Sequence, residues 1–382
     1  MAISGFLGSM STEVAGIFVV IMGVMGIAFL YPVVKKLKNI VPYVYPNARI
    51  RAKEAKLIKS DTFEEMISVA SLSEVISMLE NTDHLKFAQS ISIDKAEDVE
   101  TPVDKYMADL YWEIASIVPK KDLPLMKTLM AMWDARNLKL IVRNVHLFET
   151  GRGGKTDEDI IKLMVRSPME KSIKNLVDAR TMDEMATGLE GSAFDLSAYI
   201  PHYRQTGSLS ILENALYRVV YEVMLKELPP NEPEVKRYFS TMVGVQNLKT
   251  LLRAKRDGMS YRQIEPFLIK NAGLAEGIAK SFDELGITDM INGLEGTVFY
   301  KPLTEVLPEY DKEKSLSAFE NVLDGLIART GMDISTSHPF GMGPIIGFLS
   351  VKDMEAKNLK RIMTAKYLNL PADEIKPLMI NA

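Results

Sequence analysis

The sequence predicts an all-α protein in which one N-terminal transmembrane helix is followed by three repeated helical bundles. Three observations predict this class. The chain of 382 residues begins with a long uncharged segment, its remainder carries apolar residues at three- and four-residue spacing, and one tripeptide recurs at nearly constant intervals. Long stretches of alternating polar and apolar residues, which are typical of strands, are absent from the sequence.

The first predicted element is a membrane span at about residues 14–34. Val14–Val34 contains no charged residue, and 21 helical residues would extend roughly 31 Å, about the thickness of the hydrocarbon core. Lys35, Lys36 and Lys38 follow at once. By the positive-inside rule, we expect a protein of the cell membrane whose soluble part lies on the cytoplasmic face.

Two other interpretations of this segment are weaker. A cleaved signal peptide would need a basic region ahead of the apolar one, but residues 1–13 contain no Lys or Arg and do contain Glu13. The apolar segment is also long for a signal peptide, and no A-x-A site follows it. A buried helix of a soluble protein would rarely stay uncharged for this length.

Beyond Tyr45 the pattern is helical, and the expected breaks fall where Pro and Gly gather. They lie at Pro119 and Pro124, at Gly151–Gly154, at Pro229–Pro233 and at Ser337–Pro344.

A repeated tripeptide divides the soluble part. Asn-Leu-Lys occurs three times, at offsets of 110 and 111 residues, as Asn137, Leu138 and Lys139, as Asn247, Leu248 and Lys249, and as Asn358, Leu359 and Lys360. Apolar residues follow each copy at the same helical positions. The sixth residue after the Asn is Arg143, Arg253 and then Thr364, so the first two copies have a basic opposite face.

Two further markers keep the same frame. The first is a tetrapeptide that begins with Leu-Glu, found at Leu79–Thr82, Leu189–Ser192 and Leu294–Thr297. The second, Ser-Leu-Ser followed by Glu-Asn, links the last two copies through Glu213 and Glu320. The markers predict an N-terminal extension over residues 1–40 and three helical repeats over residues 41–150, 151–258 and 259–382.

Composition excludes several classes of function. The net charge of −4 argues against a nucleic-acid binder, and the absence of cysteine excludes disulfides and thiolate sites. The four histidines lie tens of residues apart, without metal-type spacing. We therefore expect no cofactor, no metal, no nucleic acid and no small-molecule substrate.

Three patterns resemble chemistry but favour structural roles. Gly151–Thr156 resembles the end of a phosphate loop, but Glu149 occupies the position where that motif needs a Gly, and we expect a linker. Gly341–Gly347 lacks dinucleotide-site spacing and is interpreted as a tight entry into a helix. Asp134 and Glu355 each precede an Asn-Leu-Lys by three residues, and we expect both to support neighbouring helices.

These residues carry a family resemblance. Tyr45–Ala52, the three Asn-Leu-Lys helices, and Pro344–Leu349 running into Glu355 together resemble the C subunit of archaeal A-type ATP synthases, which is related to the d subunit of V-type ATPases. The resemblance covers roughly residues 45–380. Members of that family often begin near the equivalent of Tyr45, so residues 1–40 depart from the pattern.

The resemblance implies a funnel of three helical bundles about a pseudo-threefold axis. It implies a non-catalytic central-stalk subunit that couples the rotor shaft to the membrane proteolipid ring during ATP synthesis driven by a proton or sodium gradient. Its partners would be the ring and the shaft subunits, with the N-terminal helix in the bilayer. Lys139, Arg143, Lys249 and Arg253 would be candidate contacts to acidic shaft surfaces.

Two other functions compete with this one. A membrane-anchored helical scaffold of another complex would have the same fold but would not purify with a catalytic head and a proteolipid ring. An enzyme using Gly151–Thr156 would bind nucleotide, and that binding would be lost on changing Lys155 to Ala. We expect no such binding.

Overall fold

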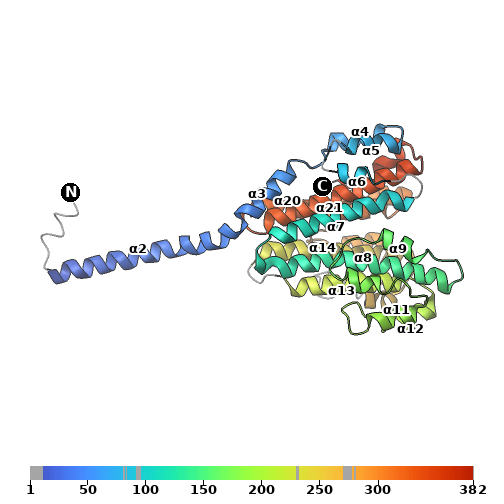
Figure 1. Cartoon of the computed structure of the whole chain (residues 1–382), viewed down its shortest axis with the longest axis horizontal. Coiled ribbons are helices and arrows are strands. Elements are labelled where there is room, and N and C mark those ends of the chain that lie inside the picture. The colour runs from blue at the N-terminus through green and yellow to red at the C-terminus, as the bar shows by residue number, and fades with distance from the viewer. Residues whose placement is uncertain are drawn as a thin grey trace.

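The computed structural model describes residues 12–80, 82, 84–91, 96–228, 232–269, 278 and 281–381. Every regular element in these ranges is a helix, so the predicted all-helical class is confirmed for the described part of the chain. One helix, α2 (Thr12–Ile40), projects away from a body that contains all the other elements (Figure 1).

Helix α2 is long and apolar. It has 29 residues, a length of about 43 Å. Its large apolar side chains are exposed, with Ile27 at 70% and Phe29 at 76%. Among the described residues, one helical segment, Gly16–Glu54, is long and apolar enough to cross a membrane.

Six long helices form the frame of the body. They are α7 (Ala96–Ile117), α8 (Leu123–Glu149), α13 (Ser210–Lys226), α14 (Pro233–Arg256), α20 (Ser317–Ser337) and α21 (Gly343–Tyr367). They run along the long axis of the body and make three consecutive pairs, α7 with α8, α13 with α14, and α20 with α21 (Figure 1). Their ends confirm the predicted breaks. Pro124, Pro233 and Pro344 each lie in the first turn of the second helix of a pair, where a missing N–H costs nothing.

Short helices connect these pairs. Ahead of α7 are η1 (Val41–Tyr43), α3 (Val44–Glu54), α4 (Ser60–Ser68), α5 (Leu72–Leu79) and α6 (Leu85–Ala88). Between α7 and α8 lies η2 (Lys120–Asp122), and α8 is followed by α9 (Asp157–Leu163), α10 (Glu170–Lys174), α11 (Met182–Leu189) and α12 (Ile200–Thr206). Between α14 and α20 are α15 (Tyr261–Ile264), η3 (Glu265–Phe267), α17 (Ile287–Asn292), α18 (Tyr300–Glu305) and α19 (Leu307–Glu313), and after α21 come α22 (Ala372–Ile375) and η4 (Lys376–Leu378).

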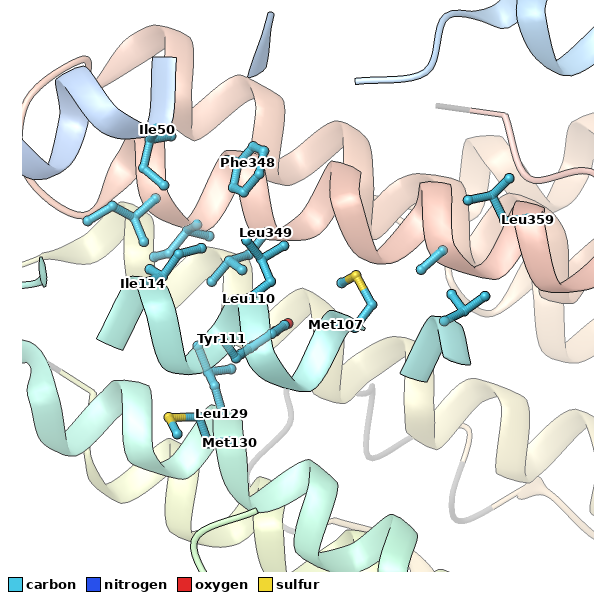
Figure 2. Close-up of a cluster of buried hydrophobic side chains, with 14 of the residues drawn as sticks. Ile50, Met107, Leu110, Tyr111, Ile114, Leu129, Met130, Phe348, Leu349 and Leu359 are labelled. Carbon is cyan, nitrogen blue, oxygen red and sulfur yellow. The ribbon is translucent and has the colours of Figure 1, made fainter. Parts of the chain in front are cut away.

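The body has three hydrophobic clusters, and each begins on the second helix of one pair. One joins α8 to α9–α12 and the start of α13, and another joins α14 to α15–α19 and the start of α20. The third joins α21 to α3–α7 and also includes residues of α8, α13, α14 and α20, so the last long helix packs against the first elements of the body. Figure 2 shows this third cluster, where Phe348 and Leu349 of α21 meet Leu110 and Ile114 of α7.

These clusters cross the repeat boundaries that the markers predict. The cluster on α8 spans the boundary at residues 150–151, and the cluster on α14 spans the one at 258–259. The units 41–150, 151–258 and 259–382 stay a prediction about the repeated sequence. The helices on which the packed clusters begin start earlier, α8 at residue 123 and α14 at residue 233, ahead of the boundaries at 151 and 259.

The Leu-Glu markers are matching turns that end a helix or a helical turn. In each, the hydroxyl group of the fourth residue donates at 2.7 Å to the carbonyl of the first: Thr82 to Leu79, Ser192 to Leu189 and Thr297 to Leu294. The same oxygen accepts the backbone N–H two residues later, from His84, Phe194 and Phe299. Asn81 of the first marker lies outside the described residues.

Candidate coupling site

The repeated asparagines make matching pairs of hydrogen bonds with an extended backbone segment. Each Asn side-chain amide donates to a backbone carbonyl and accepts the N–H of the same residue. Asn137 binds Val165 at 2.7 and 3.0 Å, Asn247 binds Ile269 at 2.9 and 2.8 Å, and Asn358 binds Ile380 at 2.9 Å in both bonds. We name each such arrangement an asparagine clamp.

The clamps hold the segment that follows each second long helix against that helix. The three Asn side chains are at most 3% exposed, so a clamp that lost its amide would leave a buried N–H and a buried carbonyl unpaired. Two of the clamps cross the predicted repeat boundaries, Asn137 to Val165 and Asn247 to Ile269, and each joins a helix to an extended segment. Their partners were not among the predicted residues.

A sequence signal for those partners exists. Ile264, Pro266 and Ile269 recur as Ile375, Pro377 and Ile380, again at an offset of 111 residues. The first copy keeps only the apolar ends of this pattern, as Ile160 and Val165. In each copy, the last apolar residue of the pattern is the one whose backbone the Asn side chain binds.

The basic residues of the first two copies lie at seams between helix pairs. Arg143 and Lys139 of α8 pair with Glu213 of α13 at 2.5 and 2.9 Å. Lys139 also lies over the ring of Tyr217, with 5.6 Å between its Nζ and the ring centroid. Both cations of this seam therefore join the first pair of long helices to the second.

The next seam repeats this arrangement. Arg253 of α14 makes a two-pronged pair with Glu320 of α20 at 2.7 and 2.8 Å, and Lys249 pairs with Asp324 at 2.7 Å. Lys357 on α21 also binds Asp324. Burial alone raises the pKa of Asp324, but the two lysines outweigh it and hold the pKa at about 2. The role of Lys139, Arg143, Lys249 and Arg253 as shaft contacts stays a prediction.

The third seam joins the last long helix to the first. Lys360 of α21 pairs with Asp104 of α7 at 2.8 Å, and Thr364 donates to Glu100 at 3.1 Å. Glu100, Glu213 and Glu320 thus occupy one position of the repeat, which the Ser-Leu-Ser marker revealed for the last two copies only. The three seams run α8 to α13, α14 to α20 and α21 to α7, and they close a cycle.

Buried carboxylates support neighbouring backbone, as predicted for Asp134 and Glu355. Asp134 accepts the N–H of Met169 at 2.8 Å, and burial raises its pKa to about 6. Glu355 accepts the N–H of Ile58 at 2.8 Å and contacts His84 at 2.7 Å. Burial alone raises the pKa of Glu355, but His84 and Lys352 outweigh it, so the pKa lies below its ordinary value.

A cavity of about 320 Å³ lies where the three pairs of long helices meet. Each long helix contributes to its lining, through Tyr111, Trp133, Tyr221, Met242, Asp324 and Asp353. Tyr111, seen in Figure 2, donates to Asp353 at 2.7 Å. Burial raises the pKa of Asp353 to about 6, against the effect of that hydrogen bond.

The two glycine-rich segments have the expected structural roles. Thr156 caps α9, and Lys155 donates its backbone N–H to Asn144 of α8 at 2.7 Å. Gly347 lets α21 approach α20 closely, because a Cβ there would lie 2.5 Å from the Cβ of Ser335. Both segments are therefore ordinary connections between helices.

Comparison with known proteins gives the family. The family model described as ATP synthase (C/AC39) subunit matches residues 46–378. The chain belongs to the ATP synthase (C/AC39) subunit family. The predicted family is thereby confirmed over nearly the whole soluble body.

Individual members of the C/AC39 family align over most of the chain. The C subunit of the A-type ATP synthase of Methanocaldococcus jannaschii is 33% identical over 91% of this chain and 89% of that protein. That of Methanothermobacter thermautotrophicus is 31% identical over 90% and 89%. Both relatives are named for a non-catalytic part of the synthase, which confirms the prediction that the chain is not an enzyme.

A third C/AC39 relative bears on the N-terminal extension. The corresponding A-type synthase protein of Methanosphaera stadtmanae is 29% identical over 95% of this chain and 94% of its own length. That coverage is too large for residues 1–40 to lie wholly outside the alignment. Part of residues 1–40 is therefore aligned with this relative, whereas the family model begins only at residue 46, as expected from the family pattern.

Proposed function

We propose that the chain is the central-stalk subunit of an A-type ATP synthase that couples the rotor shaft to the membrane proteolipid ring. In this role it makes and breaks no covalent bond. It transmits torque between a ring driven by a proton or sodium gradient and the nucleotide-binding head during ATP synthesis. The observation that carries the proposal is the closed cycle of three seams.

A torque coupler must resist deformation between its two partners. Packed helices are stiff, because protein interiors are as dense as organic crystals. In an open arc of repeats the first and last units would be free to separate, whereas the pair of Lys360 with Asp104 ties them together. The cycle supports the proposed funnel with a pseudo-threefold axis.

The cavity shared by the six long helices, about 320 Å³, is too small for a helix but has room for a few side chains, and we propose that it receives those at the tip of the shaft. Its lining combines aromatic rings with two carboxylates that are already paired, Asp324 with Lys249 and Lys357, and Asp353 with Tyr111. Apolar side chains of the shaft would therefore pack against the rings. The proposed contacts to acidic surfaces of the shaft are the basic residues of the first two seams, Lys139, Arg143, Lys249 and Arg253.

Helix α2 is the proposed membrane anchor, with the body on the cytoplasmic face of the cell membrane. If the body is centred over the ring, a single span would enter the ring's lipid-filled centre and turn with it. The chain contains no cysteine, so a single Cys at Met25 would carry a specific crosslinker. Crosslinks to the proteolipid are expected, and crosslinks only to stator subunits would contradict the ring-centre position.

The coupling role is tested by an affinity pull-down of the full chain from solubilised membranes, with mass spectrometry and an ATPase assay on the eluate. Head subunits, shaft subunits and a small proteolipid are expected together with ATPase activity. Recovery with unrelated membrane proteins would instead support a scaffold of another complex.

A further inference from the structure

The end of the body from which α2 leaves carries a cluster of exposed apolar side chains. Val41, Val44 and Tyr45 are 61–62% exposed, and Phe340, from the loop between α20 and α21, is 62% exposed. Phe340 lines a cavity of about 520 Å³ together with Ile40, at the end of α2. The loop therefore lies beside the point where α2 joins the body. We name Val41, Val44, Tyr45 and Phe340 the collar.

The segment that carries most of the collar is basic, and the two arginines and the lysine at its end are paired with Glu54 and Glu113. Residues 35–53 include six Lys or Arg and no Asp or Glu, and the nearest acidic residues along the chain are Glu13 and Glu54. Lys35 and Lys38 are exposed on the last turns of α2. An apolar and aromatic surface flanked by lysines, directly after a span, matches the headgroup zone of a bilayer and the anionic lipids in it.

Acidic side chains near the collar are already paired. Glu232 lies 3.8 Å from Lys121, and Glu234 lies 3.0 Å from Arg237. Lys121 remains half-exposed, with 56% of its side chain accessible. The surface that faces away from the body at this end is therefore apolar and basic.

We propose that the collar is seated in the headgroup region of the membrane and binds anionic lipid there. This inference rests on the proposed membrane insertion of α2. It adds that the body touches the bilayer directly, so that α2 and the collar form one continuous anchor. Lipid fits better than a protein partner, because α2 and the collar are continuous and α2 is apolar on all sides, whereas a helix packed on protein shows one apolar face.

The test uses a fluorophore on single cysteines in the full chain, reconstituted into phosphatidylglycerol nanodiscs. One sample contains lipid with a nitroxide on the headgroup, and a parallel sample contains lipid with a nitroxide deep in the acyl chain. Phe340→Cys and Val44→Cys report on the collar, and Met25→Cys reports on the span. Leu368→Cys is the matched control, because Leu368 is 58% exposed but lies just beyond the far end of α21, about 37 Å from its start.

Quenching at positions 340 and 44, with none at 368, is the expected result. It should weaken in phosphatidylcholine nanodiscs and in the Lys35→Glu, Lys38→Glu variant, because the attraction to anionic headgroups is then lost. Quenching at 25 by the acyl-chain nitroxide, without quenching at 340 or 44 by the headgroup nitroxide, would overturn the collar proposal and leave the anchor intact. Absence of acyl-chain quenching at 25 as well would overturn both.

Discussion

Two bundles of the body place different residues at the same positions of the repeat. Where α21 packs against the first soluble elements, Glu355 meets His84, and Lys352 pairs with both. In the bundle of α14, the equivalent of Glu355 is Gly244, and the equivalent of His84 is Phe299.

In the bundle of α14, uncharged residues occupy the positions of the ionic cluster. A Cβ on Gly244 would lie 2.4 Å from the ring of Phe299, so the ring fills the space that a side chain would need. The equivalent of Lys352 there is Thr241, which bonds to its own helix. One backbone position thus accepts either a buried ionic cluster or an aromatic ring on glycine, provided that its partners change together.

The bundle with the ionic cluster is also the one that joins residues far apart in the chain. His84 and Glu355 are 271 positions apart, and both are at most 2% exposed. A buried charge is costly unless its partner is in place. The ionic cluster is therefore stable only when the last long helix is packed against the first elements of the body. We infer that closure of the cycle is specified by the ionic cluster and that the α14 bundle is held mainly by packing.

The largest effect is expected from Glu355→Gly alone. Lys352 would be left buried beside His84 without its carboxylate, at a cost of about 3–5 kcal/mol in the free energy of unfolding. Urea unfolding of the detergent-solubilised chain measures this. The triple variant His84→Phe, Lys352→Thr, Glu355→Gly copies the α14 bundle and should recover most of the loss. A triple variant no more stable than the single one would contradict the equivalence of the two bundles.

The asparagine clamps should behave alike in the two bundles. Changing Asn247 or Asn358 to Leu removes two hydrogen bonds and leaves a buried N–H and carbonyl unpaired, which costs about 2–3 kcal/mol. The exposed Asn292→Ala is the control and should cost less than about 0.5 kcal/mol. The same urea titration measures both variants. Unequal losses in the free energy of unfolding would show that the bundle of α21 differs from the bundle of α14 in its backbone as well as in its charges.

The pH dependence of stability isolates the carboxyl of Asp353. Its pKa is about 6 when folded, against an ordinary value of 3.8. Between these pH values the folded state holds a proton that the unfolded state has released, so the free energy of unfolding falls as the pH rises from about 4 to about 6. Asp353→Asn should remove this part and gain stability relative to the parent as the pH rises, while the exposed Asp333→Asn should not. A parallel pH profile for Asp353→Asn and the parent would count against the raised pKa.

The smallest effects are expected at the exposed seams. Arg253→Ala breaks a pair whose Arg side chain is 52% exposed, and it should cost about 0.2–1 kcal/mol. Thr364→Arg supplies the third seam with the cation that the other two have, opposite Glu100, and should stabilise by at most a similar amount. Both gains and losses should shrink at high salt. A loss at Arg253 as large as that of Glu355→Gly would reverse the ranking of the two bundles.

Local features of the sequence determined the helical class, the apolar N-terminal helix and the breaks between long helices. Pro and Gly act on their own turn of backbone, and an apolar stripe needs only its own helix to be recognised. The asparagine repeat was equally visible, because three copies share one spacing. A polar side chain buried on an apolar helix must find a partner, and the clamps supply it.

Tertiary structure alone decided which residues meet. Asn358 binds Ile380, 22 positions away, but Lys360 binds Asp104 across 256 positions, and no local spacing encodes that pair. The packed clusters do not follow the predicted repeat boundaries, because a long helix carries apolar residues on two faces and serves two clusters. Sequence periodicity therefore predicts a number of units without giving their packed limits. Their closure into a cycle depends on shape and buried charge that only the folded chain brings together.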